Sequence, residues 1–235
     1  MKTVRLFAGL AVASVAFLAT AVAMAPAFIV GIIYCLDALH GERRDRSILF
    51  WKSLPVSDLV TVLAKASIPL IVVPAMAFGV TLVMEWIMLL LSTGVLAASG
   101  LGSAGLWSKV TMFQMQLLYH LVTVHVLWYA PIYAWMLLVS GWARRATFLW
   151  VGLPPLAIFI VEQVAFNTAH FAKFVAYRFS GPQDFSMTPD TFAAHSAMHL
   201  SLAEFLSTSG LWGGLVVAAI LLAAAVRLRR YQGPI

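Results

Sequence analysis

Apolar and polar residues follow one another in long blocks along this chain. Five apolar runs cover approximately residues 6–36, 59–93, 110–140, 147–166 and 209–227. Each is long enough to cross a bilayer, which takes roughly 20 helical residues. The runs are apolar on every side, so their length identifies them and their periodicity does not. The pattern predicts an all-α fold, a polytopic membrane helix bundle of about five spans that forms one transmembrane domain over residues 1–235.

Prolines inside three of these runs predict kinks or breaks. Pro69 and Pro74 lie in the second run, Pro131 lies in the third, and Pro154 and Pro155 lie in the fourth. In a multi-span bundle, neighbouring helices can satisfy the backbone groups that a proline leaves free. The prolines therefore favour several packed spans over isolated helices.

The four connections between the runs differ in character. Segment 37–58 is charged, and segment 141–146 is short and basic. Segment 94–109 is rich in Gly, Ser and Ala, which predicts a flexible or re-entrant hairpin. Segment 167–208 is the long polar loop of the chain, and we expect it to be external.

Composition supports an integral membrane protein. The 235 residues are 62% hydrophobic and 10% charged, with a mean hydropathy of +0.94. A soluble domain carries about 25% charged residues. The formal charge of +6 comes from short basic clusters between apolar runs, so no nucleic-acid partner is expected. Cys35 is the single cysteine, which excludes an intrachain disulfide.

The distribution of Lys and Arg predicts the orientation. Placing segment 37–58 in the cytoplasm puts more basic residues on that side than on the other, as the positive-inside rule requires. Arg43, Arg44 and Arg46 would cost about 3 kcal/mol each at mid-bilayer, so this segment stays outside the lipid core. We therefore expect segment 37–58 and the C-terminus to be cytoplasmic.

The first residues resemble a signal peptide, with a basic start and a cleavage-like site near residue 25. The apolar run continues to Leu36, which is longer than a signal core needs. We therefore expect a span here. Five spans would place the basic N-terminus outside, and an upstream helix absent from this sequence would remove that conflict.

Segment 42–58 has an apolar stripe. Ile48 with Trp51, and Phe50 with Leu54, are spaced as neighbours on a short interfacial helix that ends before Pro55. Two interpretations are equally supported by the residues alone. An apolar knob flanked by charge suits a cleft on a partner protein. An aromatic and basic belt at the lipid headgroups is the alternative. Residue 57 or 58 is expected to cap the next span.

Several strings resemble a known family. They are YCLDAL at 34–39, ERRDRSILFWKSLPVSD at 42–58, LWYAP at 127–131, WARR at 142–145, LPP at 153–155, and AFNT with HF at 165–171. Together they resemble a bacterial ABC transporter permease family of the type-2 exporter class, over roughly residues 25–230. Segment 42–58 is the specific match, and the others are individually weak.

The resemblance implies a fold and partners. Such permeases have six spans and a cytoplasmic N-terminus, whereas this chain starts inside the region that matches the family's second span. They lie in the bacterial cytoplasmic membrane, pair as homodimers or heterodimers, and bind cytoplasmic ABC ATPase subunits through a short helix at the position of segment 42–58. The implied ATPase-coupling residues are Glu42, Arg43, Arg44, Asp45, Arg46, Ile48, Phe50, Trp51, Lys52 and Leu54.

No Walker A pattern occurs in the sequence. ATP and Mg²⁺ would therefore be held by a separate ATPase, and we expect no cofactor and no catalytic residue in this chain. The function that the resemblance implies is a permease subunit that exports a substrate by alternating access. The alternatives are a membrane scaffold or assembly protein and, less favoured, an intramembrane enzyme. The apolar, Met-rich spans favour an amphipathic cargo.

Three polar residues are candidates for a translocation path: His120, His125 and Glu162. The two histidines are five residues apart, roughly 140° around a helix, so a shared metal site is not expected. A polar contact within the bundle is the favoured interpretation for both. Glu162 lies near the predicted outer end of its span, where an interfacial position is the alternative. His195 and His199 form a weak metal pattern, and we expect an amphipathic outer surface there.

Overall fold

The computed structural model describes residues 25–100, 102, 104–180 and 202–234. Within these ranges the fold is helical and contains no strand, which confirms the predicted all-α class. Among the described residues, five helices are long and apolar enough to cross a membrane: Ala25–Arg44, Asp58–Ala98, Gly105–Trp128, Thr147–Phe166 and Ser209–Tyr231. The chain is therefore a multi-pass membrane protein. The predicted start of the first span, at residues 6–24, lies outside the described residues.

The second span is longer than predicted. It joins α4 (Asp58–Ser67), a π-helical turn η1 (Ile68–Val72) and α5 (Val73–Ala98). Ser57 caps its start by accepting a hydrogen bond from the backbone N–H of Val60 at 3.3 Å. Pro69 lies inside the wide turn and Pro74 lies directly after it at the start of α5, and the helix is not interrupted at either proline. At 1.5 Å per residue it is about 60 Å long, roughly twice the hydrocarbon core.

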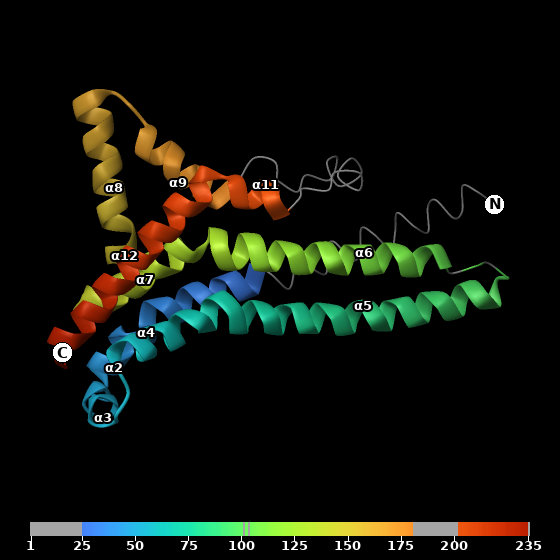
Figure 1. Cartoon of the computed structure of the whole chain (residues 1–235), viewed down its shortest axis with the longest axis horizontal. Coiled ribbons are helices and arrows are strands. Elements are labelled where there is room, and N and C mark those ends of the chain that lie inside the picture. The colour runs from blue at the N-terminus through green and yellow to red at the C-terminus, as the bar shows by residue number, and fades with distance from the viewer. Residues whose placement is uncertain (1–24, 101, 103, 181–201, 235) are drawn as a thin grey trace.

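The predicted flexible hairpin at 94–109 is wrong over most of its length. Helix α5 continues to Ala98, and α6 (Ala104–His120) begins a few residues later. A small residue such as Gly94 permits a turn but does not by itself end a helix. The turn comes where Gly100 adopts a φ of 68°, a conformation that glycine takes without steric cost. Figure 1 shows α5 and α6 as one long antiparallel hairpin.

The predicted span 110–140 is divided in the structure. Helix α6 continues into a second π-helical stretch, η2 (Leu121–Trp128). The helix is then interrupted at Tyr129, and α7 (Ala130–Trp142) follows. Pro131 lies at the start of α7, where its missing N–H costs no helical hydrogen bond. A break at Pro131 was expected from the sequence and is confirmed. Helix α7 packs most extensively against α12 (Ser209–Tyr231).

Helix α8 (Thr147–Phe166) has the predicted bounds and carries Pro154 and Pro155 inside it. A proline at 155 cannot donate to the carbonyl of Val151, four residues earlier. The indole Nε1 of Trp135 on α7 donates to that carbonyl at 3.2 Å instead. No residue of α8 is buried, and the helix runs across the direction of α5 and α6 in Figure 1. Its apolar surface therefore faces lipid or another protein.

The segment 167–208 is partly helical, so the expectation of one long polar loop is wrong at both ends. Helix α9 (His170–Ser180) follows α8, and α11 (Leu202–Ser207) precedes α12. Residues 181–201, including the predicted histidine pair, lie outside the described residues. Phe205 and Leu211 pack with Val124 and Trp128 of η2 in one buried cluster, which anchors this part of the chain to the spans.

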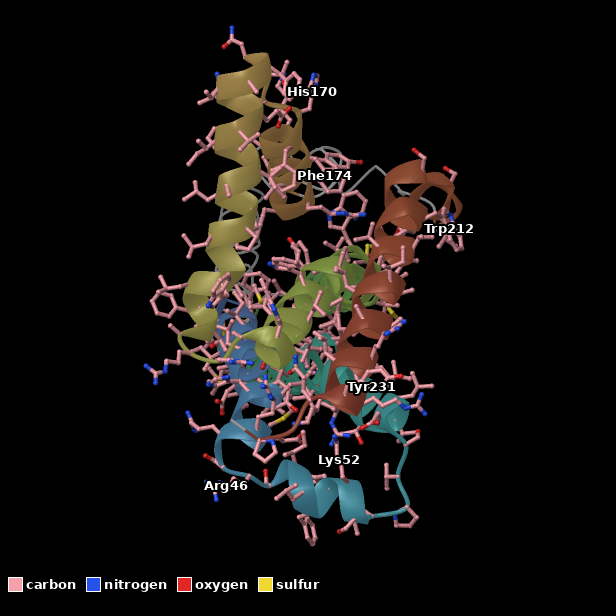
Figure 2. The ribbon with its side chains drawn as sticks, turned by 90° about the vertical axis from the view of Figure 1, so that its left-hand side faces the viewer. Arg46, Lys52, His170, Phe174, Trp212 and Tyr231 are labelled. Atoms are coloured by element: carbon pink, nitrogen blue, oxygen red, sulfur yellow. The ribbon has the colours of Figure 1, made fainter. Side chains whose placement is uncertain are left out.

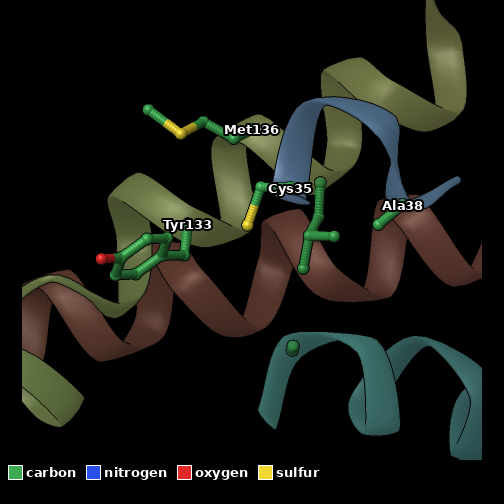
Figure 3. Packing of buried hydrophobic residues seen from close by; sticks show 6 residues of the cluster. Cys35, Ala38, Tyr133 and Met136 are labelled. Atoms are coloured by element: carbon green, nitrogen blue, oxygen red, sulfur yellow. The ribbon is translucent and has the colours of Figure 1, made fainter. Parts of the chain in front are cut away.

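The main core lies between α7, α4 and the helix over residues 25–38. Tyr133, Leu137 and Cys35 are fully buried there, and Figure 3 shows Cys35, Tyr133 and Met136 of this cluster. A Cβ at Gly31 would lie 3.2 Å from the Tyr133 ring, so a small residue is needed at this crossing. Small residues at helix crossings are the usual basis of packing in membranes.

Candidate functional site

Helix α3 (Ile48–Ser53) projects from one end of the molecule. It ends two residues before Pro55, as the sequence predicted. Ile48 is buried, whereas Leu49, Phe50 and Trp51 are 58%, 61% and 44% exposed. The rings of Phe50 and Trp51 meet edge to face with centroids 5.7 Å apart. Three neighbouring apolar side chains therefore form an outward-facing knob at the tip of this short helix.

Charged side chains surround the knob. Arg44, Asp45 and Arg46 form the exposed turn before α3, and Lys52 lies on α3 itself. Arg46 has a φ of 58°, which turns the chain sharply between α3 and the short helix before it. Figure 2 shows Arg46 and Lys52 at the end of the molecule opposite His170. The Arg44–Asp45 pair is exposed at 3.1 Å, so it adds little stability and leaves both charges accessible to a partner.

A buried ion cluster lies behind this turn. Glu42 of α2 (His40–Arg44) pairs with Lys65 of α4 at 3.1 Å and with Arg229 of α12 at 3.3 Å. Arg229 also pairs with Asp58 at the start of α4. Each charge has a partner of opposite sign, which is the condition under which buried charges are tolerated. The cluster ties α2 to two of the candidate spans, and we refer to Glu42, Asp58, Lys65 and Arg229 as the ion cluster.

Hydrogen bonds to backbone groups also hold segment 37–58 in place. Arg43 donates to the carbonyls of Gly141 at 2.6 Å and Gly233 at 3.2 Å. Lys52 donates to the carbonyl of Gln232 at 3.0 Å. The Oγ of Ser140 accepts hydrogen bonds from two backbone N–H groups at the start of α2. The structure therefore brings segment 37–58, the end of α7 and the C-terminal residues together at one end of the molecule.

The predicted coupling residues differ in how far they are exposed. Glu42, Arg43 and Ile48 are buried in contacts within the chain, so they position the segment and do not face outward. Leu54 is half-buried. The outward-facing members are Arg44, Asp45, Arg46, Phe50, Trp51 and Lys52.

Sequence reasoning missed four residues of this region. Leu49 belongs to the knob, and its only sequence signal is its place beside Phe50. Lys65, Asp58 and Arg229 complete the ion cluster. A lysine inside an apolar run was a usable signal for Lys65, because such a charge needs a partner. For Arg229, no local pattern shows that it reaches α2.

The two candidate path residues whose side chains the structure describes, His125 and Glu162, have separate sets of partners. His125 is buried in η2, where its Nε2 lies 3.3 Å from the carbonyl oxygen of Pro69 and 3.4 Å from the hydroxyl of Tyr133. This confirms the predicted polar contact within the bundle for His125. His120 ends α6, and its side chain lies outside the described set.

Glu162, near the end of α8, forms hydrogen bonds with the residues that follow this helix. Its carboxylate accepts hydrogen bonds from the backbone N–H groups of His170 at 2.7 Å and Phe171 at 2.9 Å, and from the hydroxyl of Thr168 at 2.9 Å. These N–H groups begin α9, so the side chain caps that helix. A role for Glu162 in translocation stays a prediction.

A second buried cluster lies where α9 meets α12 and η2. The guanidinium of Arg178 lies 4.4 Å from the ring centroid of Trp128 and donates to the carbonyl of Gly210 at 2.6 Å. It occupies the place that a Cβ at Gly214 would take. Burial lowers the pKa of Arg178 from its ordinary value. The two glycines of α12 thus provide a notch for one arginine side chain of α9.

The described side chains contain no group of three or more His, Cys, Asp or Glu that could hold a metal ion. Comparison with protein-family models, with curated proteins and with solved structures finds no match to this chain. Function must therefore be argued from the arrangement at the α3 end.

Proposed function

We propose that this chain is the membrane-spanning permease subunit of an ATP-driven ABC exporter, coupled to a separate ATPase through segment 42–58. The arrangement of α3 carries the proposal. Phe50 and Trp51 project outward from a short helix whose base is tied to the spans. Protein partners commonly bind through aromatic side chains that become buried in the complex, with charged residues around them. The resemblance of this segment to the coupling region of such permeases supports the same role.

The connections behind α3 supply a route for movement. A partner that displaces the knob would also move α2, because the turn at 44–47 is short. The ion cluster would pass that movement to α4 and α12, and Arg43 would pass it to the end of α7. Alternating access needs only that ATP binding favours one of two arrangements of the spans. In this mechanism, Glu42 and Arg43 transmit the movement and the knob receives it.

The proposal places the chain in the bacterial cytoplasmic membrane with α2, α3 and the C-terminus on the cytoplasmic side. The basic residues at that end of the molecule support this orientation. Pairing with a second permease is part of the proposal. The largely exposed surface of α8 supports it, since such a helix offers apolar area to a neighbour or to lipid.

The experiment is co-purification from detergent, with mass spectrometry to identify an ABC ATPase that remains bound. Phe50→Ala with Trp51→Ala removes the knob, and we expect loss of the bound ATPase and of its stimulated turnover. Phe174→Ala with Phe179→Ala is the matched control, because these rings are about equally exposed on α9. Figure 2 shows Phe174 far from α3.

Two results would contradict the proposal. If the wild-type chain binds no ATPase, it acts as a scaffold or assembly protein and not as a permease. If the knob variant keeps full binding and turnover, α3 is a headgroup belt and the coupling lies elsewhere.

The proposed cargo is amphipathic or lipid-like. Apolar side chains, methionines among them, dominate the exposed faces of α5 and α6, and few ionisable groups are found there. In reconstituted vesicles with the ATPase, ATP should drive export of a fluorescent lipid analogue. Export of an acidic, fully water-soluble dye in preference to the lipid analogue would contradict this choice of cargo.

A further inference from the structure

Glu85 lies inside the long α5–α6 hairpin, away from the α3 end. Its side chain is 4% exposed. Thr81 and Leu89, one helical turn to either side, are also buried, so the three residues form one stripe along α5. On α6, Val110 and Leu117 are buried as well. We call these five residues the hairpin seam, and the carboxyl group lies at its centre on α5.

The carboxylate has no compensating charge in the described part of the chain. Both of its oxygens are buried and no ion pair reaches them there, so the amide of Gln114 is the polar contact that offsets part of their burial. The polar side chain beside it is Gln114 of α6. The other ionisable residues in the sequence of α6 are Lys109 and His120, whose side chains are outside the described set.

The surroundings of the seam are apolar. Val83, Met84 and Trp86 are exposed on the outer surface of α5, in a helix apolar enough to cross a membrane. A carboxylate in such surroundings is strongly disfavoured unless another charge accompanies it. Such residues in membrane helices commonly mark sites where protons or ions bind.

We propose that Glu85 is a monovalent-cation site in the hairpin seam, at which the carboxylate takes up a proton or a sodium ion. A bound proton would be donated in a hydrogen bond to the amide oxygen of Gln114. A sodium ion would take the carboxylate and the same amide oxygen as ligands, since hard cations prefer oxygen. This site does not depend on an ATPase partner.

The test uses dicyclohexylcarbodiimide on the full chain in detergent or native membranes. This apolar reagent reacts with a protonated carboxyl: the proton passes to a carbodiimide nitrogen, and the carboxyl oxygen bonds to the central carbon. No other reactant is needed. We expect mass spectrometry to locate the label at Glu85 in sodium-free buffer. Glu85→Gln should lose this label, and the control Glu162→Gln should keep it.

The effect of sodium on the label shows whether the bound cation is a proton or a sodium ion. A label that sodium leaves unchanged, with potassium as the ionic-strength control, identifies a proton site. A label suppressed by sodium but not by potassium identifies a sodium site. Infrared difference spectra between wild type and Glu85→Gln give a second measurement, because a protonated carboxyl has its own C=O band. Absence of both the label and this band in sodium-free buffer would overturn the proposal.

Discussion

Arg229, in the last turn of α12, lies 3.3 Å from the carboxylate of Glu42 on α2. The two residues are far apart in the sequence, and both are buried. Through Lys65 and Asp58 the same cluster reaches α4. The ion cluster therefore connects α2, which precedes the knob, to α4 and α12. A movement of the knob would reach these spans through it.

Removing Glu42 should destabilise the protein strongly. Glu42→Ala leaves Lys65 with no acidic partner in the described structure and deprives Arg229 of one of its two, and breaking a buried ion pair costs about 3–5 kcal/mol. Thermal unfolding in detergent should show a large decrease in Tm. Asp45→Ala is the control, since Asp45 is exposed and a change of less than about 0.5 kcal/mol is expected. Equal Tm values for the two variants would show that the cluster does not hold α2.

Gly214 should tolerate no side chain. Gly214→Ala places a methyl group where the Arg178 guanidinium lies, and overpacking of this kind costs about 1–3 kcal/mol. The variant should have a lower Tm and altered Trp fluorescence, because the guanidinium leaves the Trp128 ring. Gly213→Ala is the matched control, since nothing lies within 4 Å of a Cβ there. Similar melting of both variants would contradict the described notch.

Trp135 and Pro155 should show energetic coupling. Trp135→Phe removes the N–H that satisfies the Val151 carbonyl, at a cost of about 1 kcal/mol. Pro155→Ala restores a backbone N–H four residues after Val151. In that background the same Trp135→Phe change should cost less, which a double-mutant cycle of unfolding free energies measures. Additive effects would show that the indole does not replace the missing backbone donor.

Glu162 should matter to α9 and not to transport. Glu162→Ala removes the acceptor for the first N–H groups of α9, so hydrogen exchange should increase at residues 170–173. Gln163→Ala, on the exposed neighbouring residue, is the control. Lost transport with unchanged exchange in α9 would favour the translocation role instead.

The span pattern could be predicted because lipid imposes a length on apolar helices. The run 147–166 corresponds to α8 residue for residue. The ends of the other spans were less accurate. Gly94 and Ala98 belong to a loop by composition but to a helix in the structure, because a small residue permits a turn and does not require one. The break at Tyr129 followed from Pro131, whose missing N–H is a local property.

The site could be predicted only in part. The short helix before Pro55 follows from local spacing, and so does the cap at Ser57. Which residues of segment 42–58 face outward depends on contacts with α12 and the C-terminal residues, which no local pattern encodes. Glu42 was named among the implied coupling residues, whereas the structure buries it beside Arg229.

The most direct test of the proposed coupling is photocrosslinking from position 50. A photoreactive phenylalanine analogue at Phe50 should form an ATP-dependent crosslink to the ABC ATPase in intact membranes, and the same analogue at Phe174 should form none. A crosslink from Phe50 to lipid alone, with or without ATP, would show that α3 is a membrane-surface belt and would contradict the proposed function.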